Sequence, residues 1–311
     1  MNHLKLWTVA ISLSCAAALH AQSTAGTQID PTPHKIRFIN VEKGVKLEVI
    51  DWGGSGRPLI LLPGLGDTAH VFDKLAVKLT PTHHVYGITT RGFGASDAPS
   101  PVTANYSADR LGDDVVTVID ALKLEHPVLA GHSLAGEELS SVATRHPEKI
   151  AALIYIDAGY PYALYDKAHG DLVLDAIEMR NKLEQLHPGT LPSDRKQLDE
   201  LLTMTRQLEQ VLQQRKDDLS TTSLPHPINN PISVAMLDGQ KKYTQIHLPV
   251  LAIFNIPHSP DHLRTMENQV KAFETQVPQA KIIRIPNSNH YVFQANEADV
   301  LRDMNAFIGS L

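Results

Sequence analysis

A serine on a predicted sharp turn is the strongest chemical signal in this sequence. An apolar strand at 128–130 leads into the segment GHSLAG, and a helical stretch follows at once. Such a turn pushes the side chain of Ser133 out at the end of the strand, and Gly131 and Ala135 are small because larger residues would collide there. The start of the helix, first the N–H group of Leu134, faces a negative charge developing on a reacting oxygen. The pattern predicts a nucleophilic serine.

A serine hydroxyl is a weak nucleophile unless a base takes its proton as it attacks. The chain has 16 histidines, so position must select the base. His290 lies in the loop between the last apolar strand, 282–285, and the final helix. His132 is adjacent to Ser133, but neighbouring side chains at a strand end point in opposite directions. His132 is therefore a poor candidate for the base, and His290 stands out by its place in this loop.

Short strands alternate with helical stretches along most of the chain. Strands are expected at 35–40, 45–52, 58–62, 84–89, 127–130, 151–156, 249–254 and 281–285. Helices are expected between the later strands, and a final helix at 297–308. This alternation is typical of an α/β fold in which helices cover both faces of a mostly parallel central sheet.

The alternation stops between residues 160 and 247. Two charged helical stretches, 171–185 and 193–216, occur there, and the second repeats leucines at helical spacing. We predict a helical cap, 160–247, inserted between two strands of a core formed by 35–159 and 248–311. In that position it would cover the active site.

Several local segments resemble the α/β-hydrolase superfamily, and the resemblance extends over most of residues 36–311 outside the cap. Besides the serine turn, the matching segments are LLPGLGDT at 61–68, RGFGAS at 91–96, and Asn289-His290 before an acidic helix. The resemblance implies the α/β-hydrolase fold. It also implies that His290 is the catalytic base, because the family carries its base in this loop.

The resemblance also implies where the oxyanion of an acyl-transfer reaction would bind. The family uses the backbone N–H of the residue at Leu65, together with that of Leu134. This chain has Pro63-Gly64 where the family usually has His-Gly. A backbone donor needs no side chain, so the role of Leu65 is kept.

The acid that would orient His290 has two candidates. The family normally places its acid after the strand that matches 249–254, where this chain has His258 in the expected position and Asp261 three residues later. Some members carry the acid one strand earlier, where this chain has Asp157. Both aspartates keep the chain order serine, acid, histidine, and both remain open here.

The N-terminus has the order of a secretory signal peptide: Lys5, an apolar run at 6–19, and small residues before Gln22. The run is short for a membrane span. We expect residues 1–21 to be removed near Ala21, a linker at 22–34, and export to the periplasm or the medium. The one cysteine, Cys15, lies in this segment, which excludes disulfides and a cysteine nucleophile in the mature chain.

Composition limits the partners. The formal net charge of the 311 residues is −6, so the chain has no excess of basic residues of the kind that binds nucleic acid. No stable membrane insertion of the mature chain is expected. Metal-binding and nucleotide-binding motifs are absent from the sequence, so we expect neither a cofactor nor a metal. Nothing in the sequence indicates an oligomeric state.

The predicted function is hydrolysis of a small or medium carboxylic ester through an acyl-enzyme on Ser133. Related enzymes of this fold that open epoxides or remove halogen use an aspartate nucleophile, so Ser133 argues against both. Two alternatives stay open. The same residues could cleave an amide, a lactone or a C–C bond beside a carbonyl, or the chain could be a weakly catalytic protein that binds a small ligand.

Overall fold

The computed structural model describes residues 33–311, except 160–164, 166–171, 185–194, 219–227 and 259. The chain divides into two compact units. The described residues of the larger unit lie within Ala25–Tyr165 and Pro231–Leu311, and those of the smaller unit lie within Asp166–Asn230. The predicted signal peptide and all but the last two residues of the predicted linker lie outside the described residues, and both stay predictions.

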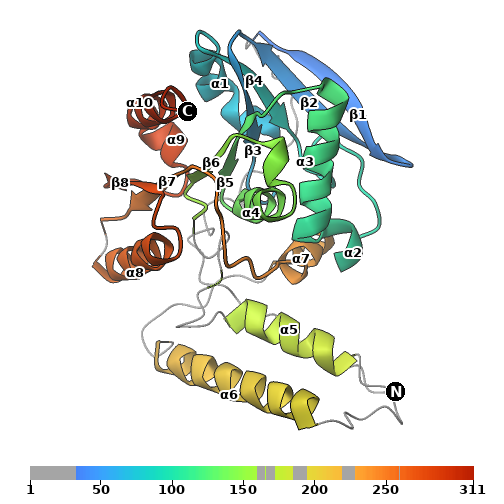
Figure 1. Ribbon diagram of the computed structural model, residues 1–311, viewed down its shortest axis with the longest axis vertical. Helices are drawn as coiled ribbons and strands as arrows, with labels where there is room; N and C mark the ends of the chain where they lie inside the picture. Colours follow the sequence, from blue (N-terminus) through green and yellow to red (C-terminus); the bar gives the residue numbers. More distant parts are fainter. Residues whose placement is uncertain (1–32, 160–164, 166–171, 185–194, 219–227, 259) are drawn as a thin grey trace. The chain divides into compact units, whose positions relative to one another are not determined.

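An eight-stranded sheet forms the centre of the larger unit (Figure 1). Its strands are β1 (Lys35–Glu42), β2 (Val45–Gly53), β3 (Arg57–Leu62), β4 (His83–Ile88), β5 (Val128–His132), β6 (Ala152–Ile156), β7 (Val250–Ile256) and β8 (Lys281–Pro286). The spatial order is β1-β2-β4-β3-β5-β6-β7-β8. β2 pairs antiparallel with both β1 and β4, and all other pairs are parallel. The predicted mostly parallel sheet is confirmed.

Helices cover both faces of this sheet. The helices of the larger unit are α1 (Asp73–Leu79), α2 (Thr103–Tyr106), α3 (Ala108–Leu122), α4 (Ala135–Arg145), α7 (Pro231–Asp238), α8 (Pro260–Gln276), α9 (Val292–Ala295) and α10 (Glu297–Ile308), with 3-10 turns η2 (Ala69–Phe72) and η3 (Pro147–Lys149). One apolar core joins the sheet to α3, α4 and α8, and a second joins it to α1, α9 and α10. Buried strands supply both cores because successive side chains point to opposite faces: Leu129 enters the first, Val128 and Ala130 the second.

The register of the parallel strands decides which loops meet. Leu62 at the end of β3 pairs with Gly131 of β5, and His132 pairs with Ile156 at the end of β6. The chain leaves all three strands at the same edge of the sheet. The loops after β3, β5 and β6 are therefore direct neighbours, which is where open α/β sheets bind ligands.

The smaller unit contains helices α5 (Leu172–Glu184) and α6 (Arg195–Asp218), which pack together. Lys182 Nζ of α5 lies 3.6 Å from Glu200 Oε2 of α6. α5 falls within the predicted helical stretch 171–185, and α6 begins within the predicted stretch 193–216 and ends two residues after it. That this segment covers the active site stays a prediction.

The predicted insertion, 160–247, extends too far at its C-terminal end. Residues from Pro231 onward belong to the larger unit. The Gly239 carbonyl accepts a hydrogen bond from the Ala108 N–H, and the Tyr243 hydroxyl donates to Asp109 at 2.8 Å. These contacts fix the segment against α3, and the sequence pattern did not predict them.

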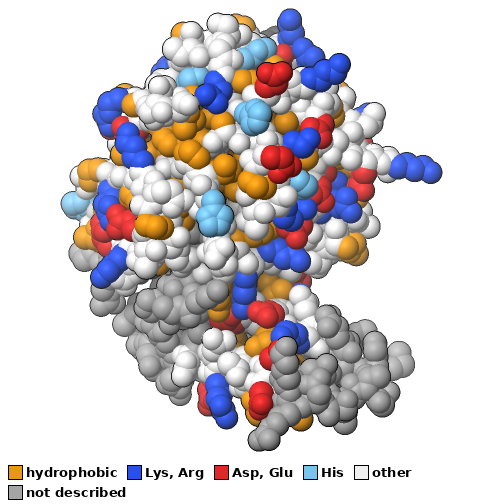
Figure 2. All heavy atoms as spheres, in the orientation of Figure 1, with side chains coloured by type: hydrophobic (Ala, Val, Ile, Leu, Met, Phe, Trp, Pro, Cys, Tyr) orange, Lys and Arg blue, Asp and Glu red, His pale blue; other side chains and the backbone are white. Residues whose placement is uncertain are grey.

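The surface of the larger unit carries charges of both signs. Figure 2 shows Lys and Arg side chains interspersed with Asp and Glu, with apolar side chains between them. Within the described residues, no helix combines the length and apolar character needed to cross a membrane. The same residues contain no group of three or more His, Cys, Asp or Glu side chains arranged to hold a metal ion.

Candidate active site

Ser133 stands on a sharp turn between β5 and α4. Its backbone φ is 54°, a left-handed conformation that is uncommon for a residue with a side chain. A Cβ atom on Gly131 would lie 3.1 Å from the Ala135 Cβ, and one on Gly64 would lie 3.0 Å from the Ser133 Cβ. Both contacts are tighter than ordinary packing allows. A side chain at either position, one before the serine and one on the adjacent β3 loop, would therefore have to displace atoms of the serine turn.

A continuous chain of hydrogen bonds links Ser133, His290 and Asp157. His290 Nε2 lies 2.8 Å from the Ser133 Oγ, and His290 Nδ1 lies 2.6 Å from Asp157 Oδ2. Ser133 and Asp157 are buried, whereas the His290 side chain keeps 16% exposure. The structure thus brings the predicted nucleophile and base together with one of the two candidate acids.

Asp157 is held by the end of the neighbouring strand β7. The Asn255 N–H donates to Asp157 Oδ1 at 3.1 Å, and the Asn255 side-chain amide donates to Oδ2. Asp157 itself has a φ of 48°. With His290, the carboxylate takes part in three hydrogen bonds, and this network fixes its orientation.

The alternative acid, Asp261, belongs to helix α8, and its side chain lies outside the described part of the structure. His258, which occupies the position where the family usually has its acid, is exposed. Its Nδ1 lies 3.0 Å from Asn287 Oδ1 in the loop before His290.

His132 does not reach the serine. Its Nε2 lies 2.9 Å from the backbone carbonyl of His290, and the two rings are 4.6 Å apart. Complete burial lowers the pKa of His132 to about 3, so the ring is neutral and donates from Nε2 to that carbonyl. Nδ1 has no hydrogen-bond partner among the described residues. His132 therefore supports the loop that carries His290, in agreement with the prediction that it is not the base.

The expected oxyanion donors, the N–H groups of Leu65 and Leu134, make no hydrogen bond among the described residues. Both are thus available to a ligand. The β3 loop that carries Leu65 is braced by a hydrogen bond from the Asp67 N–H to the Gly64 carbonyl. The Tyr291 hydroxyl also donates to Asp67 Oδ2 at 3.0 Å, which ties this loop to the one that carries His290.

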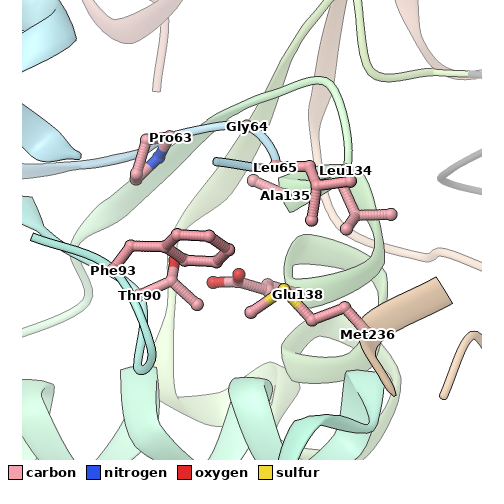
Figure 3. A pocket seen from close by; sticks show the side chains of 9 residues that line it. All are labelled: Pro63, Gly64, Leu65, Thr90, Phe93, Leu134, Ala135, Glu138 and Met236. Carbon is pink, nitrogen blue, oxygen red and sulfur yellow. The ribbon is translucent and has the colours of Figure 1, made fainter. Parts of the chain in front are cut away.

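A small pocket, with room for roughly one water molecule, opens beside these two donors (Figure 3). Leu65 and Leu134 line it on one side. Phe93 and Met236 supply apolar walls, and Glu138 of α4 is the one ionisable residue among the nine that line it. Figure 3 shows the Glu138 carboxyl between the side chains of Phe93 and Met236.

Glu138 is 5% exposed and forms no ion pair among the described residues. Burial raises the pKa of the Glu138 carboxyl to about 8, and the negative charge of Asp114 on α3 adds to this, against a hydrogen bond with the Thr90 side chain. Asp114 is itself bound by two N–H groups of Arg91 at 2.7 Å each. Glu138 is therefore mainly a neutral carboxylic acid at neutral pH.

Comparison with known proteins identifies the family. The family described as alpha/beta hydrolase fold matches residues 57–294. The chain belongs to the α/β-hydrolase family. This match includes Ser133, Asp157 and His290.

Two curated relatives and one crystal structure illustrate the similarity. This α/β-hydrolase is 26% identical to the AB hydrolase superfamily protein YisY of Bacillus subtilis, over 82% of this chain and 92% of the relative. It is 29% identical to the 2-(acetamidomethylene)succinate hydrolase of Mesorhizobium japonicum, over 41% of this chain and only 42% of the relative. The crystal structure of an E-2-(acetamidomethylene)succinate hydrolase superposes with a TM-score of 0.60 at 20% identity, covering 89% of this chain and all of that one. At this identity the superposition indicates the fold alone.

Sequence reasoning missed three supporting residues of this α/β-hydrolase. The sequence does not single out Asn255, because its contact with Asp157 depends on the pairing of β6 with β7. The sequence does not single out Tyr291 either, because its hydrogen bond to Asp67 joins loops far apart in sequence. Glu138 carried a detectable signal, because it lies four residues after Leu134 and so on the same side of α4.

We predict that Asn255→Ala lowers kcat for p-nitrophenyl acetate by about 10- to 100-fold with little change in KM, because Asp157 loses a side-chain hydrogen bond that orients it toward His290. Asn40→Ala, an exposed change on β1, is the matched control and should leave kcat unchanged. Steady-state kinetics check both variants. If Asp261→Asn abolished turnover and Asp157→Asn did not, Asp261 would be the acid.

We also predict a pH effect on stability at Glu138. The folded-state pKa of about 8 lies above the ordinary value of 4.5, so the folded chain binds more protons than the unfolded chain between these values. The stabilisation is complete below pH 4.5 and is lost as the pH rises to about 8. Over this range, the free energy of unfolding of the wild type should fall by up to about 5 kcal/mol relative to that of Glu138→Gln. Urea unfolding of both proteins from pH 5 to pH 9 tests this, and parallel curves would contradict it.

Proposed function

We propose that this chain is a serine hydrolase that cleaves a small or medium carboxylic ester through an acyl-enzyme intermediate. The observation that carries the proposal is the hydrogen-bonded chain from Ser133 Oγ through His290 to Asp157, with distances of 2.8 and 2.6 Å. Distances in this range allow direct proton transfer between serine and imidazole. Hydrolase names among the relatives support the same reaction class.

In the first half of the proposed reaction, Ser133 Oγ attacks the carbonyl carbon while its proton passes to His290 Nε2. Asp157 accepts the hydrogen bond from Nδ1 and stabilises the imidazolium. The Leu65 and Leu134 N–H groups hold the negative oxygen of the tetrahedral intermediate. The imidazolium then protonates the leaving alcohol as the C–O bond breaks, and the acyl group stays on Ser133.

In the second half, a water molecule takes the place of the alcohol. His290 removes its proton as it attacks the acyl carbon, and the same two N–H groups hold the oxyanion. Collapse of this intermediate breaks the bond to Ser133, which recovers its proton from His290, and releases the carboxylic acid. No step in this sequence calls on a cofactor or a metal.

Amide or C–C cleavage is the second candidate reaction. The names of two relatives favour this candidate. One is the Mesorhizobium japonicum relative, whose name contains an acetamido compound. The other is the 2-hydroxymuconate semialdehyde hydrolase of a Pseudomonas species, which is 32% identical over 37% of this chain. The same Ser133 and His290 chemistry would apply, with a different leaving group. A weakly catalytic ligand-binding protein is the remaining alternative, and it predicts binding without turnover.

Ser133→Ala is predicted to reduce kcat for p-nitrophenyl acetate and butyrate by about four to six orders of magnitude, because the substitution removes the hydroxyl that His290 Nε2 contacts. Ser55→Ala, in an exposed turn, is the matched control and should retain full activity. Circular dichroism and the thermal midpoint verify that both variants fold. Undiminished turnover in Ser133→Ala would exclude this serine as the nucleophile.

A further inference from the structure

The loop that carries His290 is held from the ends of two other strands. At the end of β5, His132 Nε2 donates to the His290 backbone carbonyl at 2.9 Å. After β3, Asp67 Oδ2 accepts a hydrogen bond at 3.0 Å from the hydroxyl of Tyr291, the residue that follows His290. The same β3 loop carries Leu65, an expected oxyanion donor. The Tyr291 hydroxyl therefore connects the expected base to the loop of an expected oxyanion donor.

Both the backbone and the ring of Tyr291 are held in place. Its N–H donates to Asn289 Oδ1 at 2.9 Å. Its ring centroid lies 5.0 Å from that of His132, and 5.9 Å from those of His290 and Phe293. Distances in this range are typical of packed aromatic rings. The packing fixes the position of the hydroxyl at the end of the ring, so the hydrogen bond made there constrains the whole loop.

We propose that Tyr291 and Asp67 are positioning residues for catalysis. Their hydrogen bond keeps the His290 loop and the β3 loop at a fixed separation, and the Asp67 carboxylate stabilises the protonated His290 that forms during the reaction. The inference rests on the proposed function, since it takes His290 to be the base and Leu65 to be an oxyanion donor. Tyr291 and Asp67 act through these two residues and not on the reacting atoms.

The two loops need a direct connection because the sheet does not pair the strands before them. Three strands, β5, β6 and β7, separate β3 from β8 in the sheet. In the proposed reaction, His290 takes the proton of Ser133 while the Leu65 N–H binds the oxyanion, so both loops act on one reacting group. A misplacement of about 1 Å can cost about 100-fold in rate. The hydrogen bond between Tyr291 and Asp67 opposes an independent shift of either loop.

The charge of Asp67 is the second part of the proposal. Among the described residues, the titratable side chains that face His290 from other elements are Asp157 after β6, His132 of β5 and Asp67 of the β3 loop. Burial keeps His132 neutral. Burial also raises the pKa of Asp67, against the hydrogen bond from Tyr291 and the positive charge of His290, which both lower it. Because this attraction is mutual, the Asp67 carboxylate favours the imidazolium.

Removal of the Tyr291 hydroxyl tests the hydrogen bond. We expect Tyr291→Phe to lower kcat for p-nitrophenyl acetate about tenfold, with KM within about twofold, because both halves of the reaction use the same groups. Tyr106→Phe is the matched control, since the Tyr106 hydroxyl donates to the Pro99 carbonyl at 2.7 Å. It should lower the thermal midpoint and leave kcat unchanged. A kcat of Tyr291→Phe within about twofold of the wild type overturns the positioning role.

A double-mutant cycle shows whether Tyr291 and Asp67 act through one contact. Once Asp67→Ala has removed the acceptor, the Tyr291 hydroxyl has lost this partner. The double variant Tyr291→Phe/Asp67→Ala should therefore have the same kcat as Asp67→Ala alone. Circular dichroism and the thermal midpoint verify that each variant folds. If the two losses multiply in the double variant, the residues act separately and the proposed contact is wrong.

Asp67→Asn separates the charge from the hydrogen bond, because the Asn side-chain oxygen can still accept from the Tyr291 hydroxyl. The acid limb of the kcat/KM profile reports protonation of the base in the free enzyme. Without the negative neighbour His290 is harder to protonate, so we expect this limb to move to lower pH by roughly half a unit. The limb of Tyr291→Phe, which keeps the charge, should stay in place. Coinciding limbs in Asp67→Asn and the wild type overturn the role of the charge.

Failure of the proposed function has a different signature. If the wild type does not hydrolyse p-nitrophenyl acetate or butyrate, ester hydrolysis is wrong, and positioning is then measured on the serine alone. Diethyl p-nitrophenyl phosphate transfers its diethylphosphoryl group to an activated serine and releases p-nitrophenolate, while His290 takes the serine proton. Intact-mass spectrometry follows this reaction at Ser133. A rate about tenfold lower in Tyr291→Phe supports the positioning role without ester turnover, and equal rates contradict it.

Discussion

The parallel pairing of β3, β5 and β6 is the constraint on which the rest of the site depends. Leu62 pairs with Gly131, and His132 pairs with Ile156, so the chain leaves three neighbouring strands at one edge of the sheet. The loops that follow must then supply the second backbone donor, the serine and the acid side by side. A shift of one residue in either pairing would turn each side chain to the opposite face of the sheet. The two apolar cores stabilise this register, and they therefore also fix the positions of the residues proposed to be catalytic.

Two buried carboxyl groups near Ser133 differ because their surroundings differ. Asp157 takes part in hydrogen bonds with the backbone and side chain of Asn255 and with His290. Glu138 forms a hydrogen bond with the Thr90 side chain. Burial raises the pKa of Glu138 to about 8, and the negative charge of Asp114 also raises it. One carboxylate is thus built to orient an imidazole, and the other to remain a neutral acid in a pocket wall. Environment, and not residue type, separates such roles in enzymes generally.

Local sequence patterns predicted the strands, the serine turn and the position of His290, because each depends on a short segment. The sharp turn at Ser133 could be read from its small neighbours, and the apolar strands from their runs. The sequence alone could not decide between Asp157 and Asp261 as the acid. The choice depends on which strand end faces His290, and that is set by the order of strands in the whole sheet. Asn255, Tyr291 and the placement of 231–247 on the core were missed for the same reason: each contact joins segments far apart in sequence.

Trapping the acyl group is the most direct test of the central claim that Ser133 forms a covalent intermediate. The enzyme is mixed with excess p-nitrophenyl butyrate, quenched with acid during turnover, and analysed by peptide mass spectrometry. The account predicts a butyryl group on the peptide that contains Ser133, transient in the wild type and absent from Ser133→Ala and His290→Ala. Rapid turnover with no acyl group on Ser133, or with the acyl group on another residue, would contradict it.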